Sequence, residues 1–101
     1  MGVAGEVKTI PIEEIIEEEI PQYKVILLND DITTFDFVIW LLQYLFGKSE
    51  QEAIALTFKI DEEGSGVVGI YPKEVAEAKQ AQVHQLARQH GFPLRAVIEE
   101  V

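Results

Sequence analysis

The chain has 101 residues, of which 48% are hydrophobic, and its formal net charge is −10. This acidic balance argues against sequence-independent binding of DNA or RNA, which needs Lys and Arg, and against docking on anionic lipid. The absence of cysteine excludes thiol catalysis, disulfides and cysteine-ligated metals. The length predicts one domain with a modest core, and the charge favours neutral or cationic partners.

The first 22 residues differ in composition from the rest of the chain. They contain the acidic run IEEIIEEEI between Pro11 and Pro21. A run this short is a weak isolated helix, because its glutamates repel one another. We therefore expect residues 1–22 to form a flexible acidic extension and residues 23–101 to form the folded domain. The start of the chain also lacks the basic and apolar regions of a secretory signal.

The first two expected elements flank the stretch LNDDITT. A short apolar run predicts a strand over residues 23–28. The run FDFVIWLLQYLF predicts a helix over residues 35–46, with Thr33 and Asp36 as a capping box and Gly47 as its end. Because Asp36 is its only charge, we expect this helix to be covered on most sides. It is too short to span a membrane, which needs about 20 apolar residues.

The aromatic residues of this helix could be read as a cluster that binds a cofactor. At helical spacing in an apolar segment they are expected to lie mostly in the core, with one or two near the helix start left to line a pocket. These residues are Phe35, Phe37, Trp40, Tyr44 and Phe46.

The second half of the chain predicts four further elements. A capping box of Ser49 and Glu52 starts a helix that ends in DEEGSG, and a strand follows over residues 67–71. A long helix should then run from Pro72 to about His90, before a final strand over residues 94–98. On the long helix the residues expected to face the core are Val75, Val83, Leu86 and Ala87. The order β-α-α-β-α-β predicts an α+β domain, with a small three-stranded antiparallel sheet and three helices packed on one face. Parallel pairing of the strands stays open.

Three patterns that often mark ligand sites are weak in this sequence. The glycines of GSGVVG, residues 64–69, follow a helix and precede a strand, the reverse of a dinucleotide site. His84 and His90 lie six residues apart and fall on different helix faces, which favours two surface histidines over a metal pair. The aspartates of LNDDITT lack the alternating oxygen ligands of a calcium loop. No cofactor, metal or catalytic residue is therefore expected.

The stretch LNDDITT, residues 28–34, supports two interpretations. Asn and Asp favour turns, and Thr33 or Thr34 can cap the following helix. Alternatively, the carboxylates and the amide oxygen accept hydrogen bonds from an ammonium group, beside apolar neighbours such as Phe35 and Val38. An amine clamp next to an apolar hole suits the N-terminus of a peptide whose first side chain is large and hydrophobic.

Two longer segments carry a resemblance to a known family. YKVILLNDDITTFDFV, followed by GVVGIYPKEVAEAKQAQVHQLARQHGFPL, resembles ClpS, the adaptor family of the bacterial and plastid N-degron pathway, over roughly residues 22–100. The resemblance implies an adaptor that is not an enzyme. Such an adaptor holds a substrate's N-terminal residue and passes the substrate to a Clp unfoldase and its peptidase. It also implies a monomer located in the cytoplasm, or in the plastid stroma after removal of a transit peptide.

The same resemblance implies roles for individual residues. Asn29 and Asp30 would bind the α-amino group, and Asp61 would complete this clamp. The pocket and its mouth would be formed by Asp31, Thr33, Phe35, Val38, Thr57, Ile60 and Leu94.

The partner implied by the resemblance is the N-terminal domain of a Clp AAA+ unfoldase of the ClpA or ClpC type. Glu74 and Lys79 on the long helix would contact this domain, and residues 1–22 would act in delivery.

At four positions the sequence departs from the family pattern. Phe35 replaces a gating methionine, Thr34 a proline, Thr57 a methionine and Asp61 a histidine. We expect Leu and Phe still to be accepted as first residues, and β-branched residues to be rejected by the bulky, stiff ring of Phe35.

Two other functions stay open. One is a regulatory module that docks on the unfoldase with altered or lost N-degron specificity. The other is a carboxylate or metal enzyme that uses Asp30, Asp31 and Asp61.

Overall fold

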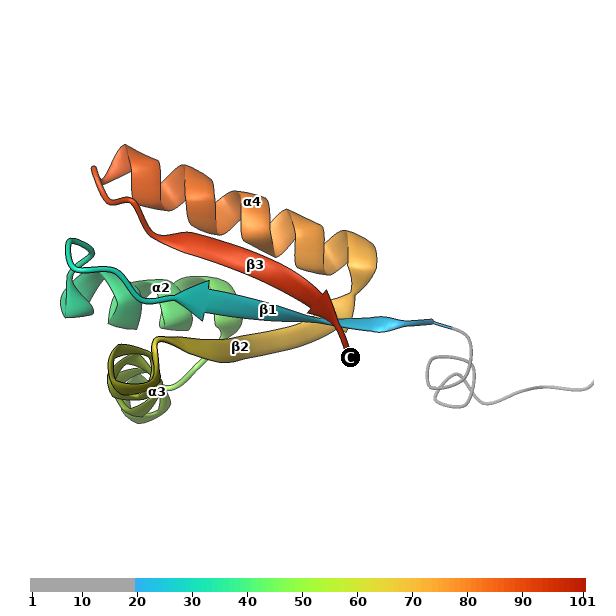
Figure 1. The fold of residues 1–101 in the computed structure, drawn as a ribbon, viewed down its shortest axis with the longest axis horizontal. Helices are drawn as coiled ribbons and strands as arrows, with labels where there is room; N and C mark the ends of the chain where they lie inside the picture. The colour runs from blue at the N-terminus through green and yellow to red at the C-terminus, as the bar shows by residue number, and fades with distance from the viewer. Residues whose placement is uncertain (1–19) are drawn as a thin grey trace, which may run out of the picture.

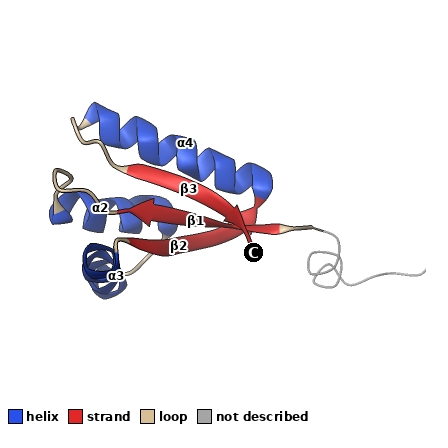
Figure 2. Ribbon diagram, in the orientation of Figure 1, coloured by secondary structure: helices blue, strands red, loops and turns tan. Residues whose placement is uncertain are grey.

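Six helices and strands follow one another along residues 20–101, the part of the chain that this computed structural model describes. Of the expected extension over residues 1–22, positions 1–19 lie outside the described residues, and Gln22 belongs to the first strand. The predicted order β-α-α-β-α-β is confirmed, and β2 begins two residues earlier than expected (Figures 1 and 2). The elements are β1 (Gln22–Leu28), α2 (Phe35–Phe46), α3 (Glu50–Glu63), β2 (Ser65–Pro72), α4 (Lys73–Gln89) and β3 (Arg95–Glu100).

The three strands form one sheet with β1 at its centre, in the order β2-β1-β3. Both neighbours pair with β1 in the antiparallel sense, so the expected antiparallel sheet is confirmed. Successive side chains of a strand point to opposite faces of the sheet. On one face, Val25 and Leu27 of β1 are fully buried, whereas Val67 and Ile70 of β2 lie on the other face and are exposed. The helices therefore cover one face of the sheet, and α4 lies along β3 (Figure 1).

Both ends of α2 are fixed by specific interactions. Thr34 caps its start by accepting a hydrogen bond from Phe37 N at 3.2 Å, so the expected capping box of Thr33 and Asp36 is wrong. Gly47 ends the helix in the left-handed region at φ 63°, as predicted. The last turn of α2 contains no basic residue. Lys79 of α4 supplies the missing positive charge by donating from Nζ to the carbonyl oxygen of Leu45 at 2.7 Å.

The exposed side of α2 contradicts the expectation that this helix is covered on most sides. Phe37 and Phe46 are buried as predicted, but Trp40 is 40% exposed and Tyr44 is 66% exposed. Their rings stack on each other with centroids 4.9 Å apart. Asp36, Trp40 and Tyr44 follow one another at intervals of four residues, so they form a single stripe that faces away from the sheet. An apolar composition all round this helix therefore does not mean burial all round.

The core face of α4 differs from the prediction at one position. Ala76, Val83 and Ala87 are fully buried, whereas Val75 is 43% exposed, so the expectation that Val75 faces the core is wrong. The three buried residues are spaced by seven and four, which keeps them on one stripe, and Val75 is rotated about 100° from it.

Two side chains of α4 satisfy the backbone of Ala96 in the edge strand β3. His84 Nε2 accepts a hydrogen bond from Ala96 N at 3.0 Å, and Gln80 Nε2 donates to Ala96 O at 2.9 Å. The first of these bonds requires an unprotonated Nε2. Burial of the imidazole and the nearby charges of Arg88 and Arg95 lower the pKa of His84 below its ordinary value of 6.5. The expectation of a simple surface histidine therefore fits His90, which is exposed, better than His84.

The depressed pKa of His84 predicts a loss of stability in mild acid. Below about pH 6.5 the unfolded chain binds a proton at His84 that the folded chain excludes, so the free energy of unfolding falls as the pH decreases. Urea denaturation at about pH 7.5 and about pH 5.5 should show this loss, and His84→Gln should reduce it. His90→Gln is the matched control and should keep the His84 contribution. An equal pH dependence in wild type and His84→Gln would contradict the assignment.

Candidate functional site

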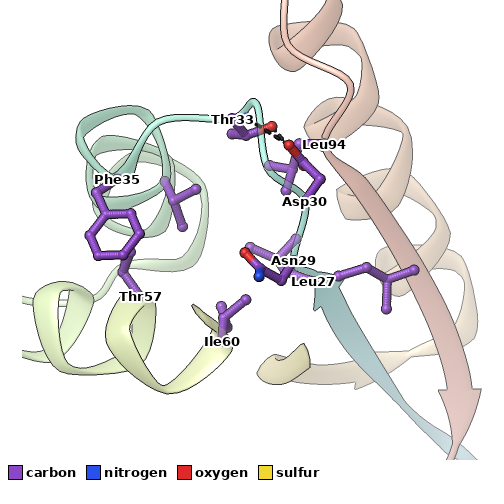
Figure 3. A pocket seen from close by; sticks show the side chains of 10 residues that line it. Leu27, Asn29, Asp30, Thr33, Phe35, Thr57, Ile60 and Leu94 are labelled. Carbon is purple, nitrogen blue, oxygen red and sulfur yellow. Dashed lines mark hydrogen bonds between the residues drawn. The ribbon is translucent and has the colours of Figure 1, made fainter. Parts of the chain in front are cut away.

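The loop between β1 and α2 folds around the carboxylate of Asp30. Its Oδ1 accepts hydrogen bonds from Ile32 N at 2.8 Å and from Thr33 N at 2.6 Å. Its Oδ2 accepts from the Thr33 hydroxyl at 2.8 Å, the bond drawn in Figure 3. Aspartate favours such turns because its short side chain reaches the backbone amides that follow it. These three bonds fix the orientation of Asp30 before any ligand arrives.

The same contacts keep the Asp30 carboxylate charged. Burial on its own would raise the pKa of Asp30, but the hydrogen bonds from Thr33 and Ile32 and the charge of Arg88 outweigh burial and lower the pKa below 3.8. At neutral pH the group is therefore an anion. A carboxylate accepts about four hydrogen bonds, so the three internal bonds leave room on Oδ2 for one further donor.

A small pocket opens beside this carboxylate and draws on several elements. Its volume is about 20 Å³, room for one or two water-sized groups. Figure 3 shows Phe35 and Thr57 on one side of it and Asp30 and Thr33 on the other. The pocket is lined by Leu27, Leu28, Asn29, Asp30, Thr33, Phe35, Val38, Thr57, Ile60 and Leu94.

The inner wall of the pocket is buried and firmly held. Val38, Ile60 and Leu94 are between 2% and 7% exposed. Thr57 is 3% exposed, and its hydroxyl donates to Ala53 O at 2.7 Å, so its one donor is already used within α3. The phenyl ring of Phe35 at the mouth is 37% exposed. The pocket therefore combines an apolar interior with a charged rim and one exposed aromatic residue.

Gly66 of β2 explains how α3 comes close enough to the sheet to form this wall. A Cβ on Gly66 would lie 2.7 Å from Cγ1 of Ile60, a contact that real structures essentially never show. The missing side chain lets Ile60 pack directly over the β2 backbone. A structural glycine, and no phosphate site, therefore accounts for this part of the GSGVVG pattern.

Not every residue expected at the site lies in the lining of the pocket. Asn29, Asp30, Thr33, Phe35, Val38, Thr57, Ile60 and Leu94 do line it. Asp31 and Asp61 are both exposed and stand outside the lining.

The two residues expected to contact a partner differ in their surroundings. Glu74 is exposed in the first turn of α4. Lys79 is partly buried, because its ammonium group bonds to Leu45 O and lies 5.9 Å and 5.8 Å from the ring centroids of Phe46 and Tyr71.

Sequence reasoning missed three residues near the pocket. Leu27 and Leu28 line it, and their position directly before LNDDITT is the signal that could have revealed them. Arg88 was also missed. Its Nη1 donates to Phe92 O and Leu94 O, each at 2.9 Å, and so holds the turn that brings Leu94 to the pocket. No local pattern identifies Arg88, because the contact depends on how α4 meets β3.

Residues 20–101 contain neither a metal-binding cluster nor a membrane-spanning helix. No three His, Asp or Glu side chains gather there in a group that could hold a metal ion. Within the same range, every helix is too short or too polar to cross a membrane.

Comparison with known proteins gives one consistent family. The family model described as "ATP-dependent Clp protease adaptor protein ClpS" matches residues 18–97. A ClpS from Nautilia profundicola is 57% identical over 95 residues, which cover 93% of this chain and 97% of that protein. A ClpS from Wolinella succinogenes is 52% identical over 88 residues, with 87% of this chain and 86% of that protein covered. Both relatives are named as adapter proteins of the ATP-dependent Clp protease.

A solved structure agrees with the fold. ClpS2 of Agrobacterium tumefaciens superposes with a TM-score of 0.78 and is 34% identical. The match covers 80% of this chain and 98% of that one. That protein was solved bound to L-phenylalaninamide.

The contacts of Asp30 predict how its carboxyl group titrates. Arg88→Gln should raise the pKa of Asp30 toward its ordinary value, because one favourable charge is lost, and NMR titration of the carboxyl carbon measures this directly. The hydrogen-bonded carboxylate stabilises the fold above the pKa of 3.8 of a free aspartate, and that contribution is lost as the pH falls through the lower folded-state pKa. Arg95→Gln removes the same charge from β3 and should leave Asp30 unchanged. An unchanged titration in Arg88→Gln would rule out the coupling.

Proposed function

This chain belongs to the ClpS family of ATP-dependent Clp protease adaptors, and we propose that it recognises substrates by their N-terminal residue. The α-amino group would bind the charged rim of the pocket, and a large hydrophobic first side chain would enter the apolar interior. The adaptor is not an enzyme: it delivers the bound protein to the unfoldase and peptidase for degradation.

The observation that carries this proposal is the ionised Asp30 carboxylate at the rim of an apolar pocket. An α-amino group has a pKa of about 7.7 to 8, so it is largely charged at neutral pH. Hydrogen bonds between charged partners are roughly twice as strong as neutral ones. Asp30 is already oriented by its own loop and keeps one acceptor site on Oδ2. It therefore requires little rearrangement to bind an ammonium group, and Asn29 offers a second acceptor beside it.

The relative from Agrobacterium tumefaciens supports the choice of ligand. L-phenylalaninamide carries the free α-amino group and the side chain of an N-terminal phenylalanine, with an amide where the peptide would continue. In its chemistry, a ligand of this kind matches the charged rim and the apolar interior of the pocket in the present chain.

The side-chain preference proposed here is for Leu and Phe. A first side chain with an unbranched Cβ should crowd the ring of Phe35 less than Ile or Val, which carry an extra group on Cβ. Thr57 presents a small side chain whose hydroxyl donates to Ala53 O. An apolar ligand beside it therefore leaves no hydrogen-bond donor of Thr57 unpaired. Asp31 and Asp61 are exposed near this site, and we assign them to the approach of the charged amine.

The proposed protein partner is the N-terminal domain of a Clp AAA+ unfoldase of the ClpA or ClpC type. Glu74, exposed at the start of α4, is the charge that we assign to this contact. Lys79 is assigned to the same surface, and its ammonium group also bonds to α2. Residues 1–22 are proposed to act in delivery.

A second candidate function is a regulatory module that docks on the unfoldase without binding N-terminal residues. One observation favours it: the pocket, with a volume of about 20 Å³, has room for only one or two water-sized groups. The two functions differ in whether a peptide binds.

Peptides that differ only at their first residue test the main proposal. By calorimetric titration we expect a Leu- or Phe-initiated peptide to bind, its N-acetylated form to bind poorly, and an Ile-initiated peptide to bind more weakly. Asp30→Ala should cost about 1.5 to 3 kcal/mol of binding free energy, because a charge-assisted hydrogen bond is lost. Undiminished binding of the acetylated peptide would overturn the ammonium clamp, and equal affinity for Ile and Leu would overturn the steric role of Phe35.

Docking on the unfoldase is tested separately. Glu74→Lys should weaken binding of the isolated unfoldase N-terminal domain, because it reverses an exposed charge, and should leave peptide binding intact. Glu77→Lys on the same helix is the matched control. If wild type binds the unfoldase domain but binds no Leu- or Phe-initiated peptide, the regulatory function replaces the proposed one.

A further inference from the structure

The ring of Phe35 has a single aromatic neighbour, Phe58 of α3, within residues 20–101. Their centroids lie 5.2 Å apart at an interplanar angle of 87°, an edge-to-face contact. Phe58 is 51% exposed and does not line the pocket. It directly follows Thr57, so it lies on the outer side of the helix that forms the pocket wall. Because Phe58 belongs neither to the core nor to the pocket lining, its contact with Phe35 is the interaction that best explains a phenylalanine at this position.

The size of the pocket means that part of its lining must move when a large side chain enters. Movement of the inner wall would disrupt core packing, since Val38, Ile60 and Leu94 are at most 7% exposed. Asp30 and Thr33 are held by the hydrogen bonds of their loop. Among the apolar lining residues, Phe35 is the most exposed, at 37%. A large side chain that enters would therefore displace the ring of Phe35, which lies across from Asp30 and Thr33 in Figure 3.

We propose that Phe58 is a positioning residue that holds the ring of Phe35 over the pocket and thereby sets which first side chains are admitted. This inference rests on the proposed binding of N-terminal residues. The two rings act as a latch: the edge-to-face contact stabilises the closed position, and a large ligand side chain binds only when the contact is broken. A small side chain does not require the opening.

The latch makes a quantitative difference between ligands. Edge-to-face aromatic pairs favour the paired arrangement by about threefold to tenfold in an equilibrium constant. When the binding-competent state is only partly populated, the apparent affinity is reduced by that fraction. The latch should therefore weaken the binding of Leu- and Phe-initiated peptides by up to this factor and leave Ala-initiated peptides unaffected.

Phe58→Ala tests the latch by removing the ring outside the pocket. Titration should show binding of Leu- and Phe-initiated peptides tightened by about threefold to tenfold, with no change for an Ala-initiated peptide. Ile54→Ala is the matched control, since Ile54 is another exposed apolar residue of α3, at 37%, and should leave every affinity unchanged. Phe58→Leu keeps an apolar side chain without the aromatic edge and should give an intermediate gain.

A measurement without ligand separates this inference from the proposed function. NMR relaxation of the Phe35 ring should show greater mobility in Phe58→Ala than in wild type, whether or not any peptide binds. Unchanged mobility, unchanged affinity, weaker binding, or an equal gain for Ala- and Leu-initiated peptides would each overturn the latch. Failure of wild type to bind Leu- or Phe-initiated peptides would instead overturn the proposed function.

Discussion

Three hydrogen bonds onto one carboxylate turn the chain from the central strand into the first described helix. The Asp30 carboxylate accepts hydrogen bonds from the amides of Ile32 and Thr33 and from the hydroxyl of Thr33. This turn brings Thr34 into the capping position of α2 and leaves Phe35 at the mouth of the pocket. The charged rim and the apolar interior thus share one origin, and Asp30 organises the loop before it meets any ligand. Removing Asp30 would disturb the shape of the site as well as its charge.

Local signals in the sequence predicted most of the fold. The capping box of Ser49 and Glu52 is present, with each side chain bonded to the other's backbone amide. Gly47 ends α2 in the left-handed region as expected. Such features lie within a few residues of one another, so a single sequence reveals them. Eight of the ten residues that line the pocket are predicted from the sequence. The chemistry of LNDDITT and its apolar flank indicates Asn29, Asp30, Phe35 and Val38, whereas the family resemblance adds Thr33, Thr57, Ile60 and Leu94.

The errors share a different physical cause, namely that burial depends on which elements meet. Trp40 and Tyr44 were expected in the core because they lie at helical spacing in an apolar segment, yet no other element of residues 20–101 covers this side of α2. Val75 is one position away from the buried stripe of α4. The contacts of Lys79 with Leu45, and of Arg88 with Leu94, join residues whose proximity depends on how α4 packs. Patterns within one helix cannot reveal contacts of this kind.

The bonds from Gln80 and His84 to Ala96 have a consequence for a protein whose task is to handle other polypeptides. An edge strand with free amide and carbonyl groups invites any extended chain to add itself to the sheet, a route both to promiscuous binding and to aggregation. Here two side chains of α4 occupy the amide and carbonyl groups of Ala96, the second residue of β3. An extended polypeptide brought for degradation therefore finds the backbone groups of Ala96 already occupied, which disfavours pairing at this end of the edge strand and favours recognition by side-chain and amine chemistry at the pocket.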